Sequence, residues 1–146
     1  VLIRAWREVE GAFPAWDLVV CGPDSVGHLS EMEGLAAALG LSRVSFVGPK
    51  YGAEKAHLLG RSEFLVLPSH TENFGFVVAE ALSAGVPAIV TRGAPWQELE
   101  NRGCGWWIDI SVETLAHALR AALAMGPSEL RAMGAREKGR RAASRL

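Results

Sequence analysis

The chain has 146 residues and a mass of 15.6 kDa, enough for one domain with a sizeable hydrophobic core. Hydrophobic residues make up 49% and charged residues 21%, which excludes a disordered chain. The net charge of −1 provides no basic field, so nucleic acid is not an expected partner. No apolar run reaches membrane-spanning length and the first residues do not resemble a signal peptide, so we expect a cytoplasmic protein.

The first half of the chain alternates between helical and strand patterns. Apolar residues recur every three or four positions from Val1 to Phe13, which predicts an amphipathic helix. That helix has no capping residue, which suggests that the chain starts inside a larger protein. Further elements are predicted as follows: a strand at Leu18 to Cys21 ended by Gly22, a helix at about Ser25 to Leu39, a strand at Arg43 to Val47 ended by Gly48, and a helix at about Ala53 to Gly60.

The second half continues the alternation. Strands are predicted at Glu63 to Leu67, Val86 to Thr91 and Gly105 to Ile108, and helices from near Asn73 to Ala84, at Ala94 to Leu99 with Pro95 in the first turn, at Val112 to Met125, and from near Glu129. Short connections between strands and helices imply a mostly parallel sheet with helices on both faces. We therefore expect one Rossmann-like α/β domain over residues 1–146.

Cysteine and tryptophan residues add little that is specific to one function. Cys21 and Cys104 are not spaced as a metal-binding pair, and reduced thiols are favoured over a disulfide. Trp106 and Trp107 are consecutive in a strand and face opposite sides, so packing in the interior is favoured over a sugar-stacking platform.

The most informative stretch runs from Pro68 to Leu82. It follows a buried strand and leads into a helix, and open α/β sheets bind ligands at such a point. Backbone N–H groups and the helix dipole there favour an anion such as a diphosphate. Glu80 lies among apolar residues, and a charge in such surroundings needs a partner. Spacing alone favours Glu72 as a helix cap and Glu80 on a narrow solvated face over a ligand-binding pair.

A resemblance reverses that preference. Glu72 and Glu80 are separated by seven residues, within Pro-Ser-x-x-Glu-Asn-Phe-Gly and before Ala-Leu-Ser-Ala-Gly-Val-Pro-Ala-Ile-Val. This run resembles the E-x7-E signature of retaining glycosyltransferases of family 4, also called glycosyl transferases group 1. The resemblance extends from the first helix to the helix after the last strand. It implies the carboxyl-terminal half of a GT-B fold, which holds the nucleotide-sugar donor. The stretch from Gly93 to Leu99, followed by Cys104 to Trp107, is similar to a subgroup that builds cell-surface polysaccharides.

The resemblance also implies roles for individual residues. Glu72 is the catalytic candidate and would accept hydrogen bonds from hydroxyls of the donor sugar, while Glu80 would hold the ribose hydroxyls. The backbone of the residues between them would meet the sugar and diphosphate: Asn73, Phe74, Gly75 and Phe76. Gly22 belongs to the predicted donor site, and the loop from Gly48 to Lys50 would contact the base. No metal or other cofactor is expected, because fixed cations and a helix N-terminus stabilise the leaving diphosphate.

The sequence departs from the family upstream of Val1. Members carry an arginine and a lysine about five residues apart just before the first helix, and these clamp the diphosphate. Here the clamp, the first strand of the sheet and the amino-terminal acceptor domain are all absent. We therefore expect an N-terminally truncated donor domain that is an enzyme when whole and inactive alone. Lys50 and Lys55 are candidates to replace the clamp, although solvated surface lysines are favoured.

Three alternatives stay open. A loop role with a structural hydrogen bond is favoured for His70 over contact with the sugar. A solvated face is the default for the basic segment from Arg131 to Leu146, with contact to an anionic membrane surface as the alternative. The rival functions are a sugar-nucleotide epimerase or phosphorylase of the same architecture, and a nucleotide-binding module without catalysis.

Overall fold

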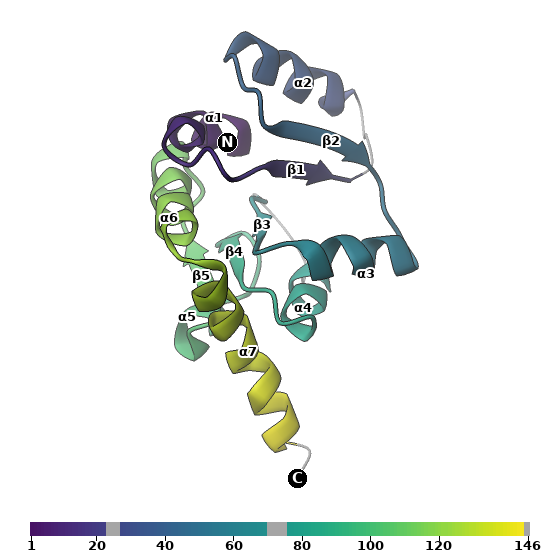
Figure 1. Ribbon diagram of the computed structural model, residues 1–146, viewed down its shortest axis with the longest axis vertical. Coiled ribbons are helices and arrows are strands. Elements are labelled where there is room, and N and C mark those ends of the chain that lie inside the picture. The colour runs from purple at the N-terminus through teal and green to yellow at the C-terminus, as the bar shows by residue number, and fades with distance from the viewer. Residues whose placement is uncertain (23–26, 70–75, 145–146) are drawn as a thin grey trace.

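The computed structural model describes residues 1–22, 27–69 and 76–144. Helices and strands alternate along the chain (Figure 1). The elements are α1 (Leu2–Val9), the 3-10 helix η1 (Glu10–Ala12), β1 (Leu18–Cys21), α2 (His28–Ala38), β2 (Val44–Gly48), α3 (Gly52–Arg61), β3 (Leu65–Leu67), α4 (Phe76–Ser83), β4 (Ala88–Thr91), α5 (Glu98–Arg102), β5 (Gly105–Ile108), α6 (Val112–Ala124) and α7 (Pro127–Ser144). The predicted α/β alternation is confirmed.

Every strand pair that the structure describes is parallel. β1 pairs with β2, with Leu18 opposite Val44. β4 lies between β3 and β5, with Ile89 opposite both Val66 and Trp106. The parallel arrangement confirms the predicted fold class, but the strands form a two-stranded and a three-stranded sheet rather than one continuous sheet.

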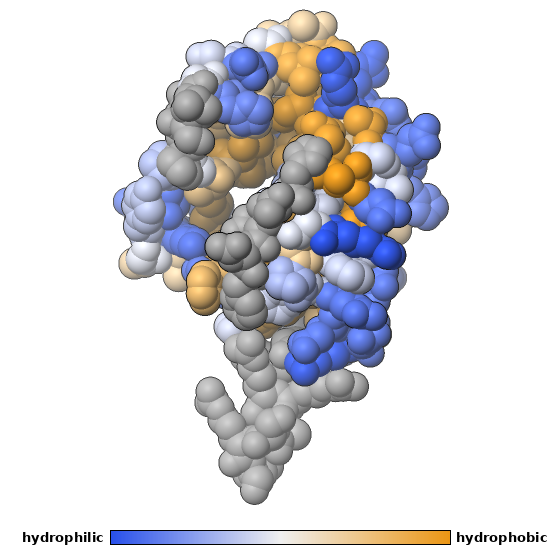
Figure 2. Space-filling model, turned by 180° about the vertical axis from the view of Figure 1, so that it is seen from behind, coloured by the Kyte–Doolittle hydropathy of each residue, from blue (hydrophilic) through white to orange (hydrophobic). Residues whose placement is uncertain are grey.

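A large apolar cavity lies between the two sheets. Its volume is about 1460 Å³, and its walls include all of β1, all of β3 and parts of α1, α3 and α6. Figure 2 shows apolar residues gathered around a hollow in the upper part of the molecule. β1 is paired only with β2 and β3 only with β4 among the described strands, so an edge of each sheet borders this cavity.

The two faces of the three-stranded sheet carry different side chains, because successive residues of a strand point to opposite sides. Ile89, Val66 and Trp106 pack into a cluster with α1 and α6, which lie side by side. Ala88, Val90 and Trp107 pack into a second cluster with α4 and α5. Helices therefore cover both faces, and the two tryptophans point to opposite sides as predicted.

Two helices differ from the sequence prediction. The predicted helix at Ala94 to Leu99 is wrong, because α5 starts only at Glu98. The Ala94 carbonyl accepts hydrogen bonds from the backbone of Trp96 and from Nε1 of Trp107, so it is not available to start a regular helical ladder. α7 starts at Pro127, slightly earlier than predicted, and proline suits the first position of a helix because its missing N–H is not needed there.

α7 packs closely against the rest of the molecule near its middle. Gly134 is buried, and a Cβ built on it would lie 1.9 Å from the carbonyl oxygen of Gly85. The helix can approach the start of β4 only because this position has no side chain. None of the helices among the described residues is long and apolar enough to cross a membrane.

Candidate functional site

Two predicted site residues meet where β1 and β2 end. The Gly22 amide donates to the Gly48 carbonyl oxygen at 3.1 Å, which joins the loops that leave the two strands. Gly48 has φ of +71°, a left-handed conformation that costs glycine little and other residues more. The short parallel pair therefore ends in a tight, glycine-dependent corner at its carboxyl edge.

The next predicted residue, Lys50, borders the cavity. Gly22, Lys50 and Lys55 all line it, together with Val77 of α4. Lys50 Nζ lies 3.9 Å from a carboxylate oxygen of Glu54, and the Glu54 side chain is mostly exposed. Such a long, exposed ion pair leaves the lysine available to other anions, since exposed pairs contribute only about 0–1 kcal/mol.

The glutamate motif is described only in its second part. His70, Glu72, Asn73, Phe74 and Gly75 lie outside the described residues. Helix α4 is described from Phe76 on, and its predicted start near Asn73 to Gly75 lies outside the described residues. The Phe76 side chain is 74% exposed, which is unusual for a large apolar residue.

Glu80 lies in the second turn of α4 and faces α3. Lys55 Nζ donates to its Oε1 at 2.9 Å across the two helices. Val78, Ala81 and Leu82 around it are buried, whereas the Glu80 side chain is 43% exposed. The sequence analysis predicts that Glu80 needs a partner, and the structure identifies that partner as Lys55.

Thr91 anchors the segment that leads into the motif. Its hydroxyl lies 2.6 Å from the Ser69 carbonyl oxygen and 3.4 Å from that of Leu67, and the residue is buried at the end of β4. The central strand thus fixes the backbone directly before residues 70–75. No motif in the sequence marks Thr91 as a site residue, although a hydroxyl at the end of a fully buried strand has to find a partner.

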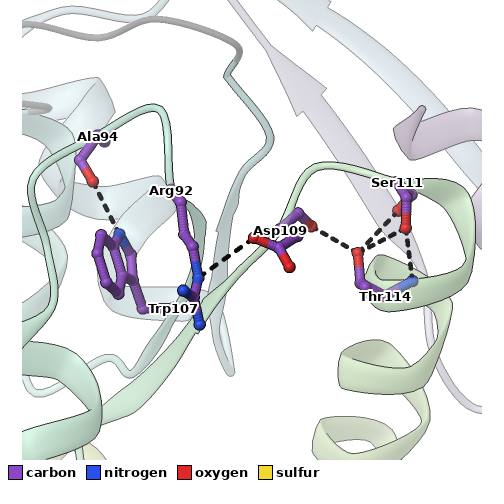
Figure 3. Close-up of polar contacts among 6 residues, drawn as sticks. All are labelled: Arg92, Ala94, Trp107, Asp109, Ser111 and Thr114. Atoms are coloured by element: carbon purple, nitrogen blue, oxygen red, sulfur yellow. Dashed lines mark hydrogen bonds and ion pairs between the residues drawn. The ribbon is translucent and has the colours of Figure 1, made fainter.

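A polar cluster fixes the next turn along the same edge (Figure 3). The Arg92 guanidinium stacks 4.8 Å from the centre of the Trp107 ring, and its Nε lies 3.4 Å from Oδ1 of Asp109. The Asp109 carbonyl in turn accepts a hydrogen bond from the Thr114 hydroxyl near the start of α6. Arg92, Trp107 and the turn between β4 and α5 line a small cavity of about 670 Å³. This cluster connects the residues that follow the ends of β4 and β5.

In the described part of the chain, no group of three or more His, Cys, Asp and Glu side chains is placed to hold a metal ion. Cys21 is exposed and Cys104 is buried, and neither forms a disulfide.

A family model described as "Glycosyl transferases group 1" matches residues 1–140. The chain belongs to this family. The matched range includes the predicted base loop, the glutamate motif, Thr91 and the Arg92 cluster.

Relatives and solved structures agree with the assignment. The chain is 33% identical, over 121 residues, to a D-inositol 3-phosphate glycosyltransferase of Actinosynnema mirum, and the aligned part covers 73% of this chain and 29% of that protein. WaaG, a glycosyltransferase involved in lipopolysaccharide biosynthesis, superposes with a TM-score of 0.80 at 28% identity, over 94% of this chain and 37% of WaaG. HepE of Anabaena, solved in complex with UDP and glucose, superposes with a TM-score of 0.79 at 21% identity, over 94% of this chain and 38% of HepE, and shows a shared fold.

These comparisons show the architecture of the chain and how much of a whole enzyme it covers. The solved structures are GT-B glycosyltransferases, so the chain has the Rossmann-like fold of one part of such an enzyme. It spans only about a third of the length of the relatives that it matches.

Proposed function

We propose that this chain is the donor-binding domain of a retaining glycosyltransferase. The whole enzyme would transfer a sugar from a UDP- or GDP-sugar to an acceptor held by a separate amino-terminal domain. WaaG is named for lipopolysaccharide biosynthesis, and synthesis of a cell-surface polysaccharide or glycolipid is the process we propose here. The observation that carries the proposal is the family match across a motif whose second glutamate, Glu80, stands partly exposed on α4.

Three features of the described residues support binding of a nucleotide. The N-terminus of α4 follows β3, so it lies at the carboxyl edge of the sheet, where a helix dipole favours a diphosphate. Glu80 offers a carboxylate to the ribose diol, and hydrogen bonds to a charged acceptor contribute about 1.5–3 kcal/mol each. The corner formed by Gly22 and Gly48 would bring backbone groups to the base.

The chemistry assigns separate tasks to the remaining groups. Glu72 would orient the donor sugar through its hydroxyls, and backbone N–H groups from Asn73 to Phe76 would stabilise the negative charge that develops on the leaving diphosphate. The acceptor hydroxyl would attack from the face that the diphosphate leaves, which retains the anomeric configuration. A metal ion has no required task in this scheme.

Calorimetry tests the proposal directly. The chain is titrated with UDP, GDP and their sugars, with and without magnesium. We expect weak, magnesium-independent binding of one nucleotide series and no transfer of sugar, because the diphosphate clamp and the acceptor domain are absent from these 146 residues. Tight binding that requires magnesium, or sugar transfer by this chain alone, would contradict the proposal.

Location is part of the same proposal. We place the enzyme in the cytoplasm, with the basic end of α7 near an anionic membrane surface where a lipid-linked acceptor would be used. Arg131 and Arg136 of α7 are both exposed. Sedimentation with vesicles of anionic and of neutral lipid tests this contact, and equal binding to both would count against it.

A further inference from the structure

The bond between Lys55 and Glu80 joins two elements that each border the proposed donor site. Lys55 lies in the first half of α3, directly after the predicted base loop, whereas Glu80 lies on α4, after the predicted diphosphate loop. Their side chains meet at 2.9 Å although the residues are 25 positions apart in sequence. Lys55 also lines the large cavity, as Gly22 and Lys50 do.

The bond also determines how the Glu80 carboxylate is presented. Among the described residues, Lys55 bonds this carboxylate through Oε1, and none of them is given a bond to Oε2. The Glu80 side chain is 43% exposed, whereas its neighbours Val78 and Ala81 are buried. Its carboxylate therefore lies outside the apolar packing that holds those neighbours. A free glutamate side chain samples several rotamers and loses that freedom on binding, a cost that a fixed partner removes in advance.

We infer that Lys55 is a positioning residue of the donor site, which holds Glu80 in the orientation that accepts the ribose hydroxyls. The inference rests on the proposed function, since it assumes that Glu80 grips the ribose. According to this inference, replacing Lys55 changes the affinity for the ligand, which replacing an ordinary surface lysine would not do. An exposed ion pair by itself changes folding stability little.

The chain offers a matched control for this ion pair. Arg120 of α6 lies 3.6 Å from a carboxylate oxygen of Glu8 on α1, and both side chains are about half exposed. This pair also joins two helices across the surface, but neither residue belongs to the proposed site. Arg120→Met therefore removes a comparable ion pair without affecting the donor.

The experiment compares each nucleoside diphosphate with its 2′,3′-dideoxy form, by ligand-detected NMR titration of the chain and of its variants. We expect Lys55→Met to weaken binding of the ribose form about three- to tenfold and to leave the dideoxy form unchanged. Lys55→Arg should restore most of the affinity. In a Glu80→Gln background, Lys55→Met should have no further effect. Arg120→Met should bind both ligands like the parent, and melting temperatures identify any variant that fails to fold.

Each other result has a definite meaning. Equal losses for the ribose and dideoxy forms would assign Lys55 to the phosphates and overturn the positioning role. Parent-like binding by Lys55→Met would overturn it as well, while leaving the proposed function standing. Failure of the parent chain to bind either UDP or GDP would overturn both.

Discussion

The Thr91 hydroxyl lies 2.6 Å from the carbonyl oxygen of Ser69 and so connects the central strand β4 to the last residues before the glutamate motif. The same hydroxyl lies 3.4 Å from the carbonyl oxygen of Leu67, the last residue of β3. Thr91 is therefore placed to fix the direction in which the chain enters residues 70–75.

Replacing Thr91 by valine tests this connection. Valine keeps the shape but removes the hydroxyl, so the Ser69 carbonyl loses this donor, and we expect a loss of about 1–2 kcal/mol in the free energy of unfolding. Nucleotide affinity should fall too, because the motif that follows is held less firmly. Denaturant unfolding and calorimetry measure the two effects. Thr91→Ser is the control, since it keeps the hydroxyl; if it weakens nucleotide binding as much as valine does, the hydrogen bond is not the cause.

Glu10 provides a second prediction, on stability against pH. It is buried, and its carboxylate accepts hydrogen bonds from Nε1 of Trp6 at 2.9 Å and from the Ser42 amide at 3.1 Å. Burial raises the pKa of this carboxyl, but the hydrogen bonds from Ser42, Trp6 and Arg43 outweigh burial and leave the pKa below its ordinary value of 4.5. Because the folded pKa is the lower one, the stabilisation is fully present above the unfolded pKa and is lost as the pH falls through the folded pKa.

Glu10→Gln separates this contribution from general acid denaturation. At pH 7 the variant should be less stable by about 1–3 kcal/mol, because an amide places donors against the donors of Ser42 and Trp6. As the pH falls below 4.5, the stability difference between variant and parent should shrink. Urea unfolding at a series of pH values measures it. A difference that stays constant down to the acid transition would show that the charge of Glu10 does not matter.

The cavity between β1 and β3 leads to a third prediction. Two sheet edges border an apolar space of about 1460 Å³, and the resemblance of the sequence predicts a strand upstream of Val1. We expect that strand to lie between β1 and β3 and to join the two sheets, since unpaired edges and exposed apolar walls are unfavourable. A version extended by the upstream sequence should bind less hydrophobic dye and melt at a higher temperature than these 146 residues. Equal dye binding by both versions would mean that the strand lies elsewhere.

The sequence predicts local elements well and contacts between distant residues poorly. β1 and β5 are found at their predicted bounds, because short apolar runs between turn residues define buried strands with little ambiguity. The start of α5 is predicted too early because the side chain of Trp107, 13 residues away, donates a hydrogen bond to the Ala94 carbonyl. No local pattern contains that information.

The same limit applies to the candidate site. The spacing of the motif places Glu80 on a helix next to apolar residues, as the structure shows. Its partner Lys55 is 25 residues earlier, and only the packing of α3 against α4 brings the two together. The split into two sheets is likewise a property of pairing in space, which the strand pattern alone does not determine.

The last prediction separates the two glutamates of the motif. If Glu80 grips the ribose, Glu80→Gln should weaken binding of a nucleoside diphosphate and of its sugar alike. If Glu72 grips the sugar, Glu72→Gln should leave diphosphate binding nearly unchanged and remove only the added contribution of the sugar. The amide keeps the shape but replaces one acceptor oxygen with a donor, so the loss should be about 1–3 kcal/mol for the ligand part that is touched.

If Glu72 only caps α4, its variant should instead lower the melting temperature by an amount that corresponds to about 1 kcal/mol and keep ligand discrimination intact. Calorimetry and thermal unfolding of both variants distinguish these cases, and equal effects of the two variants on both ligands would refute the division of roles.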